Sequence, residues 1–180
     1  MMSSMSEPRS LVRPRFFSGK KLDAADFAQE QSYILERFKR HNRSLHGFGI
    51  VFGLKVTSER GVIAVSEGMA LDCEGNELII ASRQSLSLPA TTEGWSTAHV
   101  GVRFVEVCGD SKKATEEDQA STITESFEIV FEKENYNRGH RHVRAHWLAC
   151  GNAHALTIAK LHCERHGWRV DRRYRAPQIK

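Results

Sequence analysis

Residues 24–46 contain neither glycine nor proline, and this long uninterrupted stretch constrains the fold more than any other part of the sequence. Asp23, directly before the stretch, is a favourable N-cap, and Asp26 adds a negative charge in the first turn, where the helix dipole favours one. Gly47 follows the stretch and is a typical helix stop. The sequence therefore predicts one long N-terminal helix from about Ala24 to His46.

One face of this predicted helix carries residues at alternating spacings of three and four, which is the a/d spacing of a coiled coil. We call this set of residues the seam: Ala24, Phe27, Gln31, Ile34, Phe38, His41 and Leu45. Two interpretations are open. The helix lies on the domain's own sheet, or it packs against copies of itself about a symmetry axis, where the buried polar residues Gln31 and His41 would fix the register.

After Gly47 the pattern changes to short β-prone runs separated by turn residues. The runs are 47–56, 62–65, 69–71, 77–81, 84–88, 97–107, 123–133, 142–150, 155–163 and 168–171. The polar stretch from Gly109 to Thr122 predicts an exposed loop between two strands of a hairpin. Together these features predict a mainly β (α+β) fold, a β-sandwich or open barrel of roughly nine strands with the one long helix.

A chain of 180 residues suits one ordinary domain. We expect a disordered arm over 1–14, a single helix-plus-β-sandwich domain over 15–175 and a tail over 176–180. No run reaches the roughly 20 apolar residues that span a bilayer, and the start of the sequence has no apolar segment typical of a secretory signal. These features predict a soluble protein that is made and assembled in the cytoplasm, without membrane insertion.

The formal net charge is +4, and the basic residues concentrate in residues 36–43 and 169–175. Such an asymmetry could attract nucleic acid or an acidic partner, whereas the plainer interpretation is a solvated helix face and a solvated tail. The basic residues are accompanied by no aromatic stacking platform or zinc-finger spacing, so a nucleic-acid partner is not expected.

No pattern typical of an enzyme is present: the sequence has no nucleophile elbow, phosphate-binding glycine loop or dinucleotide fingerprint. We therefore expect a protein without catalytic activity or cofactor. The alternative is a small metal-binding or nucleic-acid-associated module, since histidine and cysteine are zinc ligands and are dense near the C-terminus. Its candidate metal ligands are His140, His142, His146 and Cys150. No pair among them has a recognised zinc-site spacing.

Two stretches carry a family resemblance, RPRFFSGKKLDAADFAQEQSYILERFKRHNRSLHGFGIVFGLKV (13–56) and VIAVSEGMALDCEGNELII (62–80). The matching features are FFSG before the helix, EQ-Y in its middle, HNR-LHG at its end, then GxxxGLxV and GxAxDxxG, which overlaps the DCEGN turn. The most specific cluster is Arg40, His41, Asn42, Arg43, His46 and Gly47. The sequence resembles a family of tail-associated proteins from phages and phage-like contractile injection systems. A more distant likeness is to the N-terminal part of a type VI secretion baseplate subunit.

The resemblance implies a structural component of a phage-like tail or contractile injection particle, for baseplate or fibre attachment. It implies tail or baseplate subunits and further copies of the chain as partners. The candidate interface residues are Phe27, Gln31, Ile34, Phe38, His41, Asn42, Leu45 and His46. Asn42 and His46 lie one helical turn apart, so they either cap the helix C-terminus or contact another subunit. Under the second interpretation, replacing both by alanine abolishes assembly and leaves a folded monomer.

Overall fold

A computed structural model of the chain describes residues 10–59, 61–88, 93–109, 122–135, 137, 154–165 and 167–179. Its N-terminal helix α1 spans Ala24–His41 and continues as one π-helical turn, η1, over Asn42–His46. A capping box starts α1, in which Asp23 Oδ1 accepts from the Asp26 amide at 3.1 Å and Asp26 Oδ2 accepts from the Asp23 amide at 3.4 Å. Gly47, at φ 76°, ends the helical segment. The predicted helix is confirmed.

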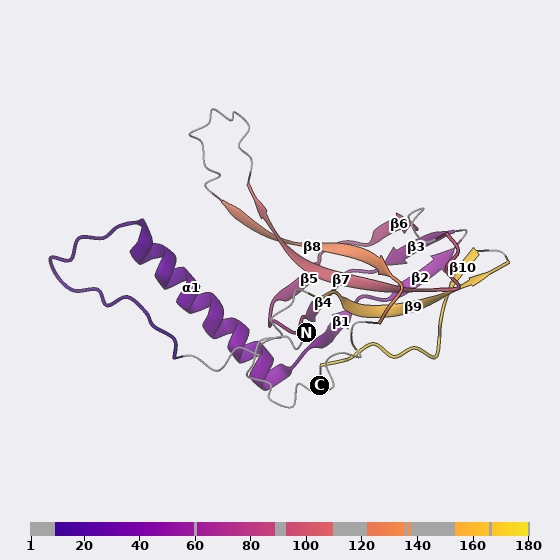
Figure 1. Cartoon of the computed structure of the whole chain (residues 1–180), viewed down its shortest axis with the longest axis horizontal. Helices are drawn as coiled ribbons and strands as arrows, with labels where there is room; N and C mark the ends of the chain where they lie inside the picture. Colours follow the sequence, from indigo (N-terminus) through magenta and orange to yellow (C-terminus); the bar gives the residue numbers. More distant parts are fainter. Residues whose placement is uncertain are drawn as a thin grey trace.

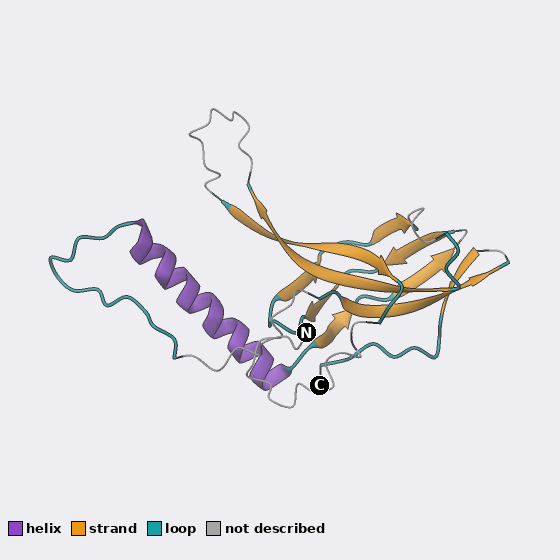
Figure 2. Ribbon diagram, viewed as in Figure 1, coloured by secondary structure: helices purple, strands orange, loops and turns teal. Residues whose placement is uncertain are grey.

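The rest of the described chain is mostly strand, arranged in three antiparallel sheets (Figures 1 and 2). The strands are β1 Gly49–Gly53, β2 Val56–Glu59, β3 Val62–Val65, β4 Gly68–Leu71, β5 Glu77–Ile80, β6 Gln84–Ser87, β7 Thr97–Cys108, β8 Ile123–Glu132, β9 Leu156–Glu164 and β10 Gly167–Val170. Their orders are β1-β4-β5, β2-β3-β6 and β10-β9-β7-β8. The prediction of a mainly β fold with one long helix is confirmed.

The predicted run 47–56 is not one strand. The chain leaves the first sheet after β1 and enters another sheet at β2, because Gly53 and Leu54 both adopt positive φ angles, of 68° and 51°. A side chain at Gly53 would place its Cβ 2.1 Å from the carbonyl oxygen of Glu67, so only glycine fits there. Leu54 points into the core and is almost completely buried. The predicted strand over 142–150 lies outside the described residues.

The three sheets share one hydrophobic core, as the alternation of apolar and polar residues predicts. Its members are Ile50, Leu54, Ile63, Val65, Ala70, Leu78, Ile80, Ala98, Val100, Val102, Leu156, Ile158, Ala159 and Leu161. Each sheet contributes to this list, so each sheet buries its inner face against the others. The arrangement matches the predicted sandwich or open barrel.

The long helix does not take part in this core. Figure 1 shows α1 projecting away from the sheets, which it approaches only at its C-terminal end. No residue of α1 is buried. The interpretation that the helix lies on the domain's own sheet is therefore wrong, because its seam contacts none of the core strands along most of its length.

The C-terminal segment runs back from β10 to β1, as Figure 1 shows in yellow. The Ile50 amide donates to the Pro177 carbonyl and the Ile179 amide donates to the Ile50 carbonyl, each at 2.9 Å. Gln178 thereby forms a parallel bridge with Ile50. Residues 177–179, within the predicted tail, thus add to the edge of the β1-β4-β5 sheet.

Neighbouring residues of β5 test this core directly. Leu78 is completely buried, whereas Ile79 is 56% exposed. We expect Leu78→Ala to lower the free energy of unfolding by about 2–5 kcal/mol, because it removes buried methyl groups and leaves a cavity. Ile79→Ala, the matched control, should change it by less than about 1 kcal/mol. Urea unfolding of both variants measures the difference, and equal effects would contradict the packing described.

Candidate interaction site: the helix and its junction with the sheets

The turn between β4 and β5, Asp72–Asn76, is held in shape by its own side chains. Asp72 Oδ1 accepts hydrogen bonds from the amides of Glu74 and Asn76 at 2.9 and 2.8 Å, and Asp72 Oδ2 accepts from Asn76 Nδ2 at 2.8 Å. The Gly75 amide donates to the Asp72 carbonyl at 3.1 Å. These bonds fix the conformation of the turn. Its Glu74 and Gly75 carbonyls accept from elsewhere.

Those two carbonyls accept from the end of the helix. Asn42 Nδ2 donates to the Gly75 carbonyl at 2.9 Å, and Arg43 Nη1 donates to the Glu74 carbonyl. Arg43 is only 5% exposed, and its Nη2 also donates to Glu36 Oε1, one and a half to two turns back on α1, at 2.6 Å. The helix is thus fastened to the β4–β5 turn by two side chains, one of which carries a buried charge.

Gly75 allows this close approach. Its φ is 88°, and a Cβ at this position would lie 2.3 Å from the Lys39 carbonyl oxygen of α1. Only a residue without a side chain lets the turn meet the helix backbone here. Lys39 adds a further contact, since its Nζ lies 5.8 Å from the ring centre of Phe104 in β7.

The π-helical turn sets where the two predicted junction residues point. Gly47 donates its amide to the Asn42 carbonyl at 3.0 Å, which closes the wider turn. Asn42 faces the β4–β5 turn inside its own chain, whereas the His46 ring lies against the His41 ring, with centroids 5.3 Å apart. The Asn42 backbone amide thus bonds carbonyls at the end of α1 while its side chain bonds a distant carbonyl, and His46 lies beside the seam.

The seam itself is exposed on this fastened helix. Phe27, Phe38 and Leu45 are 57, 65 and 69% exposed, and Ile34 is 43% exposed. Gln31 and His41 are exposed among them. Four exposed large apolar side chains on one helix face, even with two polar residues among them, are typical of an interaction surface, whereas single exposed apolar residues are common on any protein.

The segment before the helix covers one flank of α1 and leaves the seam open. In Figure 1 residues 10–23 run back beside α1. The Arg13 guanidinium lies 6.0 Å from the ring centre of Tyr33, and Lys20 Nζ donates to Asp26 Oδ1 at 2.5 Å. The hydrogen bond from Lys20 is the main reason that the pKa of Asp26 lies below its usual value. Tyr33 and Asp26 lie to one side of the seam, so these contacts do not cover it.

The structure places seven of the predicted interface residues exposed on α1 and η1, Phe27, Gln31, Ile34, Phe38, His41, Leu45 and His46, whereas the eighth, Asn42, faces the β4–β5 turn of its own chain. The junction also depends on three residues outside the predicted interface set: Arg43, Asp72 and Gly75. The DCEGN motif contained a signal for the last two, because Asp and Gly at these spacings are typical of a self-bonded turn.

The predicted metal ligands His140, His142, His146 and Cys150 lie outside the described residues. Within the described ranges, no group of three or more histidine, cysteine or acidic side chains has the geometry of a metal site. His162 Nε2 lies 3.0 Å from Asp171 Oδ2. The hydrogen bond from the Arg173 amide is the main reason that the pKa of the Asp171 carboxyl lies below its usual value. The hydrogen bond with His162 lowers this pKa further.

None of the helices in the described ranges combines the length and the apolar composition needed to cross a bilayer. No protein-family model matches the sequence, and no curated protein matches it either.

Solved structures do resemble this one. A structure titled as the baseplate complex from the type VI secretion system matches with a TM-score of 0.55 and 11% identity, over 94% of this chain and 42% of that chain. The type VI secretion TssK-TssF-TssG baseplate subcomplex matches with a TM-score of 0.52 and 14% identity, over 94% and 62%. A crystal structure of TssK matches with a TM-score of 0.50 and 11% identity, over 90% and 41%.

The chain therefore has a fold found among type VI secretion baseplate proteins, and it spans 41–62% of the length of these three chains. The resemblance to contractile injection systems noted in the sequence is matched at the level of the fold.

Alanine substitutions at two glycines with positive φ angles test the contact between the helix and the β4–β5 turn. Gly75→Ala should lower the free energy of unfolding by more than about 2 kcal/mol, because the strain of a positive φ adds to the overlap with the Lys39 carbonyl. Gly94, at φ 76°, has no atom within 4 Å of its Cβ position, so Gly94→Ala should cost only about 1–2 kcal/mol of strain.

Amide hydrogen exchange distinguishes the junction from a general loss of stability. For Gly75→Ala we expect faster exchange concentrated in α1 and the β4–β5 turn, with the β7–β9 pairing protected as before. Equal destabilisation by the two variants would contradict the close contact between Gly75 and the helix.

Proposed function

We propose that this protein is a structural, non-enzymatic subunit of a baseplate-like particle of the contractile injection type, assembled in the cytoplasm. We propose further that it joins other copies of itself through the seam of α1. The observation that carries the proposal is an apolar helix face that is exposed on a helix fastened to a rigid β body. The fold shared with type VI secretion baseplate structures supports the kind of particle.

The energetics favour burial of the seam against another molecule. Complete burial of one large apolar side chain contributes about 1.5–3 kcal/mol, and Phe27, Ile34, Phe38 and Leu45 are all partly or largely exposed. One helix face of this size is small against an association cost of roughly 4–15 kcal/mol. Several copies around one axis would bury all their seams together, which favours a closed oligomer.

The polar seam residues then select one arrangement. Gln31 and His41 would be buried between helices, where each needs a hydrogen-bond partner. Pairing between copies satisfies them in one register only, as a polar a-position residue does in coiled coils. His46, which contacts the His41 ring, would extend this polar layer to the end of the helix.

Asn42 contributes indirectly in this proposal. Its bond to Gly75, together with the bonds of Arg43, holds the helix at one angle to the sheets. A seam on a helix of fixed direction can meet the same seam on other copies without the entropy cost of ordering the helix first.

Substitutions on opposite faces of α1 test the proposed interface. We expect wild-type protein to form an oligomer that persists in high salt, and the double variant Ile34→Asp, Phe38→Asp to be monomeric, because two charges cannot be buried in the seam. The control variant Gln29→Asp, Ser32→Asp changes exposed residues on the opposite face and should keep the oligomer.

Light scattering after size exclusion, at several protein concentrations, gives the mass of each variant. Circular dichroism checks that the helix content is unchanged. A wild-type protein that is monomeric at every concentration would contradict assembly through the seam, as would a monomeric control variant that remains folded.

A further inference from the structure

One hairpin extends beyond the rest of its sheet. β9 pairs with β7 only over Thr97–Val102, whereas β7 and β8 pair with each other as far as Cys108 and Ile123. We call residues 103–108 and 123–128 the arm, and Figure 1 shows it projecting from the sheets. Among the described strands, none pairs with either outer edge of the arm. A two-stranded ribbon of this kind is marginally stable alone and offers free backbone donors and acceptors.

The arm carries an unbalanced negative charge. Glu106 lies directly opposite Glu125 in the β7–β8 register, and like charges in this position destabilise a strand pair. Within the described part of the chain, neither glutamate forms an ion pair, whereas Glu128 pairs with Arg103. Beside them, Val107 and Ile123 are 51% and 66% exposed.

A groove with the opposite charge lies at the other end of the molecule, between two edge strands. β2 ends the β2-β3-β6 sheet and β10 ends the β10-β9-β7-β8 sheet, and the groove between them has a volume of about 710 Å³. Ser58 Oγ donates to the Trp168 carbonyl across the groove. Its lining includes Val56, Trp168, Arg169 and Arg172, together with Glu164, the ion-pair partner of Arg169. It therefore offers apolar surface and cationic groups.

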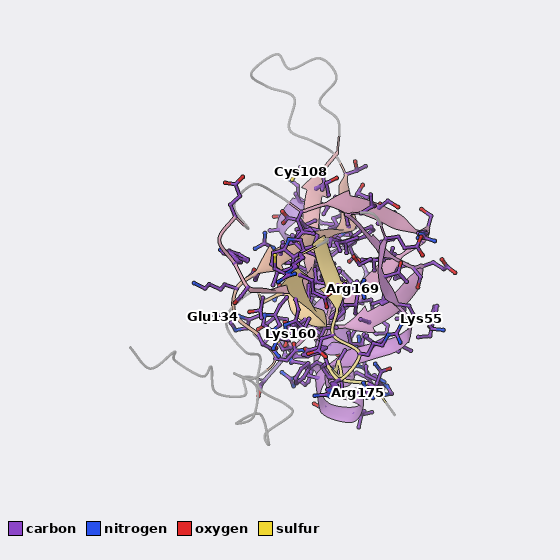
Figure 3. All side chains as sticks on the ribbon, turned by 90° about the vertical axis from the view of Figure 1, so that its right-hand side faces the viewer. Lys55, Cys108, Glu134, Lys160, Arg169 and Arg175 are labelled. Atoms are coloured by element: carbon purple, nitrogen blue, oxygen red, sulfur yellow. The ribbon has the colours of Figure 1, made fainter. Side chains whose placement is uncertain are left out.

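The charges of the two surfaces are complementary. The arm includes three glutamates and one arginine, hence a net charge of −2. The groove lining holds Arg169, Arg172 and Glu164, hence +1, and the described residues of 160–179 around it carry six lysines and arginines and two acidic residues. Figure 3 looks onto this end of the molecule, with Arg169 near the centre of the view and Lys55, Lys160 and Arg175 around it. Arg169 forms an exposed pair with Glu164, which contributes little stability.

We propose that the acidic arm of one copy docks into the basic groove of a second copy. Arginines of the groove would relieve the repulsion between Glu106 and Glu125, and Val107 and Ile123 would lie against the apolar lining. The arm and the groove lie at opposite ends of the molecule (Figure 1), so one copy cannot fill its own groove. Such a head-to-tail contact is heterologous and links copies into rings or rows. It rests on the proposed assembly role but not on the seam.

A charge swap tests this contact. The arm variant Glu106→Arg, Glu125→Arg has a basic arm and a basic groove, and the groove variant Arg169→Glu, Arg172→Glu has an acidic arm and an acidic groove. We expect wild-type protein to form larger species in low salt than in high salt, and each variant alone to lose them. An equimolar mixture should regain them, because each arm then meets a groove of opposite charge.

Analytical ultracentrifugation measures the species, and we expect the association constant to fall at least about tenfold for each variant alone. The control Arg83→Glu, Glu93→Arg changes exposed charges outside both surfaces and should associate like wild type. Thermal unfolding checks each variant, and Arg172→Glu alone replaces the groove variant if the loss of the Arg169–Glu164 pair unfolds it.

The same measurement in the Ile34→Asp, Phe38→Asp background separates this contact from the seam. Association in low salt that survives in this background supports the arm contact whatever the seam does. A wild-type mass that does not depend on salt, or a mixture that fails to associate, overturns the arm contact. Neither result bears on a salt-resistant oligomer formed by the seam.

Discussion

The fastening of α1 to the β4–β5 turn is the interaction on which the rest of the structure depends. The helix contributes nothing to the hydrophobic core, so its direction is set only where it ends. There Asn42 and Arg43 donate to two carbonyls that the Asp72 turn has already oriented. The penalty for leaving a buried arginine without partners makes this arrangement specific, because displacing the turn would strand the Arg43 charge.

This fastening also explains how an apolar helix face can remain outside the core. A helix that could rotate freely would tend to lay its seam on the sheets, since burial of apolar surface is favourable. The contact between Gly75 and the Lys39 backbone holds the end of the helix in place, and the segment before the helix reaches the flank that includes Tyr33. The exposed seam is thus a consequence of strong polar contacts at one end, not of weak packing.

Local patterns in the sequence were sufficient to predict the long helix and most of the strands. Asp23 and Gly47 delimit the helical segment, and the apolar alternation in runs such as 77–81 and 97–107 predicts strands close to those observed. The change of sheet at Leu54 was not predictable, because leucine at a positive φ leaves no local signal and only the opposing carbonyl of Glu67 requires it. The glycines of the run 47–56 indicate a bend or a close backbone approach, which Gly53 shows, but they do not indicate a change of sheet.

The candidate site was likewise predictable in part only. The seam follows from periodicity, which is a property of a single helix. The exposure of the seam does not follow from periodicity. Whether a seam packs on the chain's own sheet depends on contacts between residues that are far apart in sequence. Asn42 and Gly75 are separated by 33 positions, and Arg43 belongs to a basic run that is typical of a solvated surface, although it is buried.

The attachment of the C-terminal segment to β1 has a mechanical consequence. β1 follows the helix directly and is bonded on one side to β4 and on the other to Pro177 and Ile179. Any force that neighbours exert on α1 enters the body through the start of this strand. Because hydrogen bonds on both of its edges lie across the strand, a pull along β1 loads them in shear and together rather than one after another. The last residues of the chain therefore act as a brace, and removing them would leave the strand that bears the load held on one edge only.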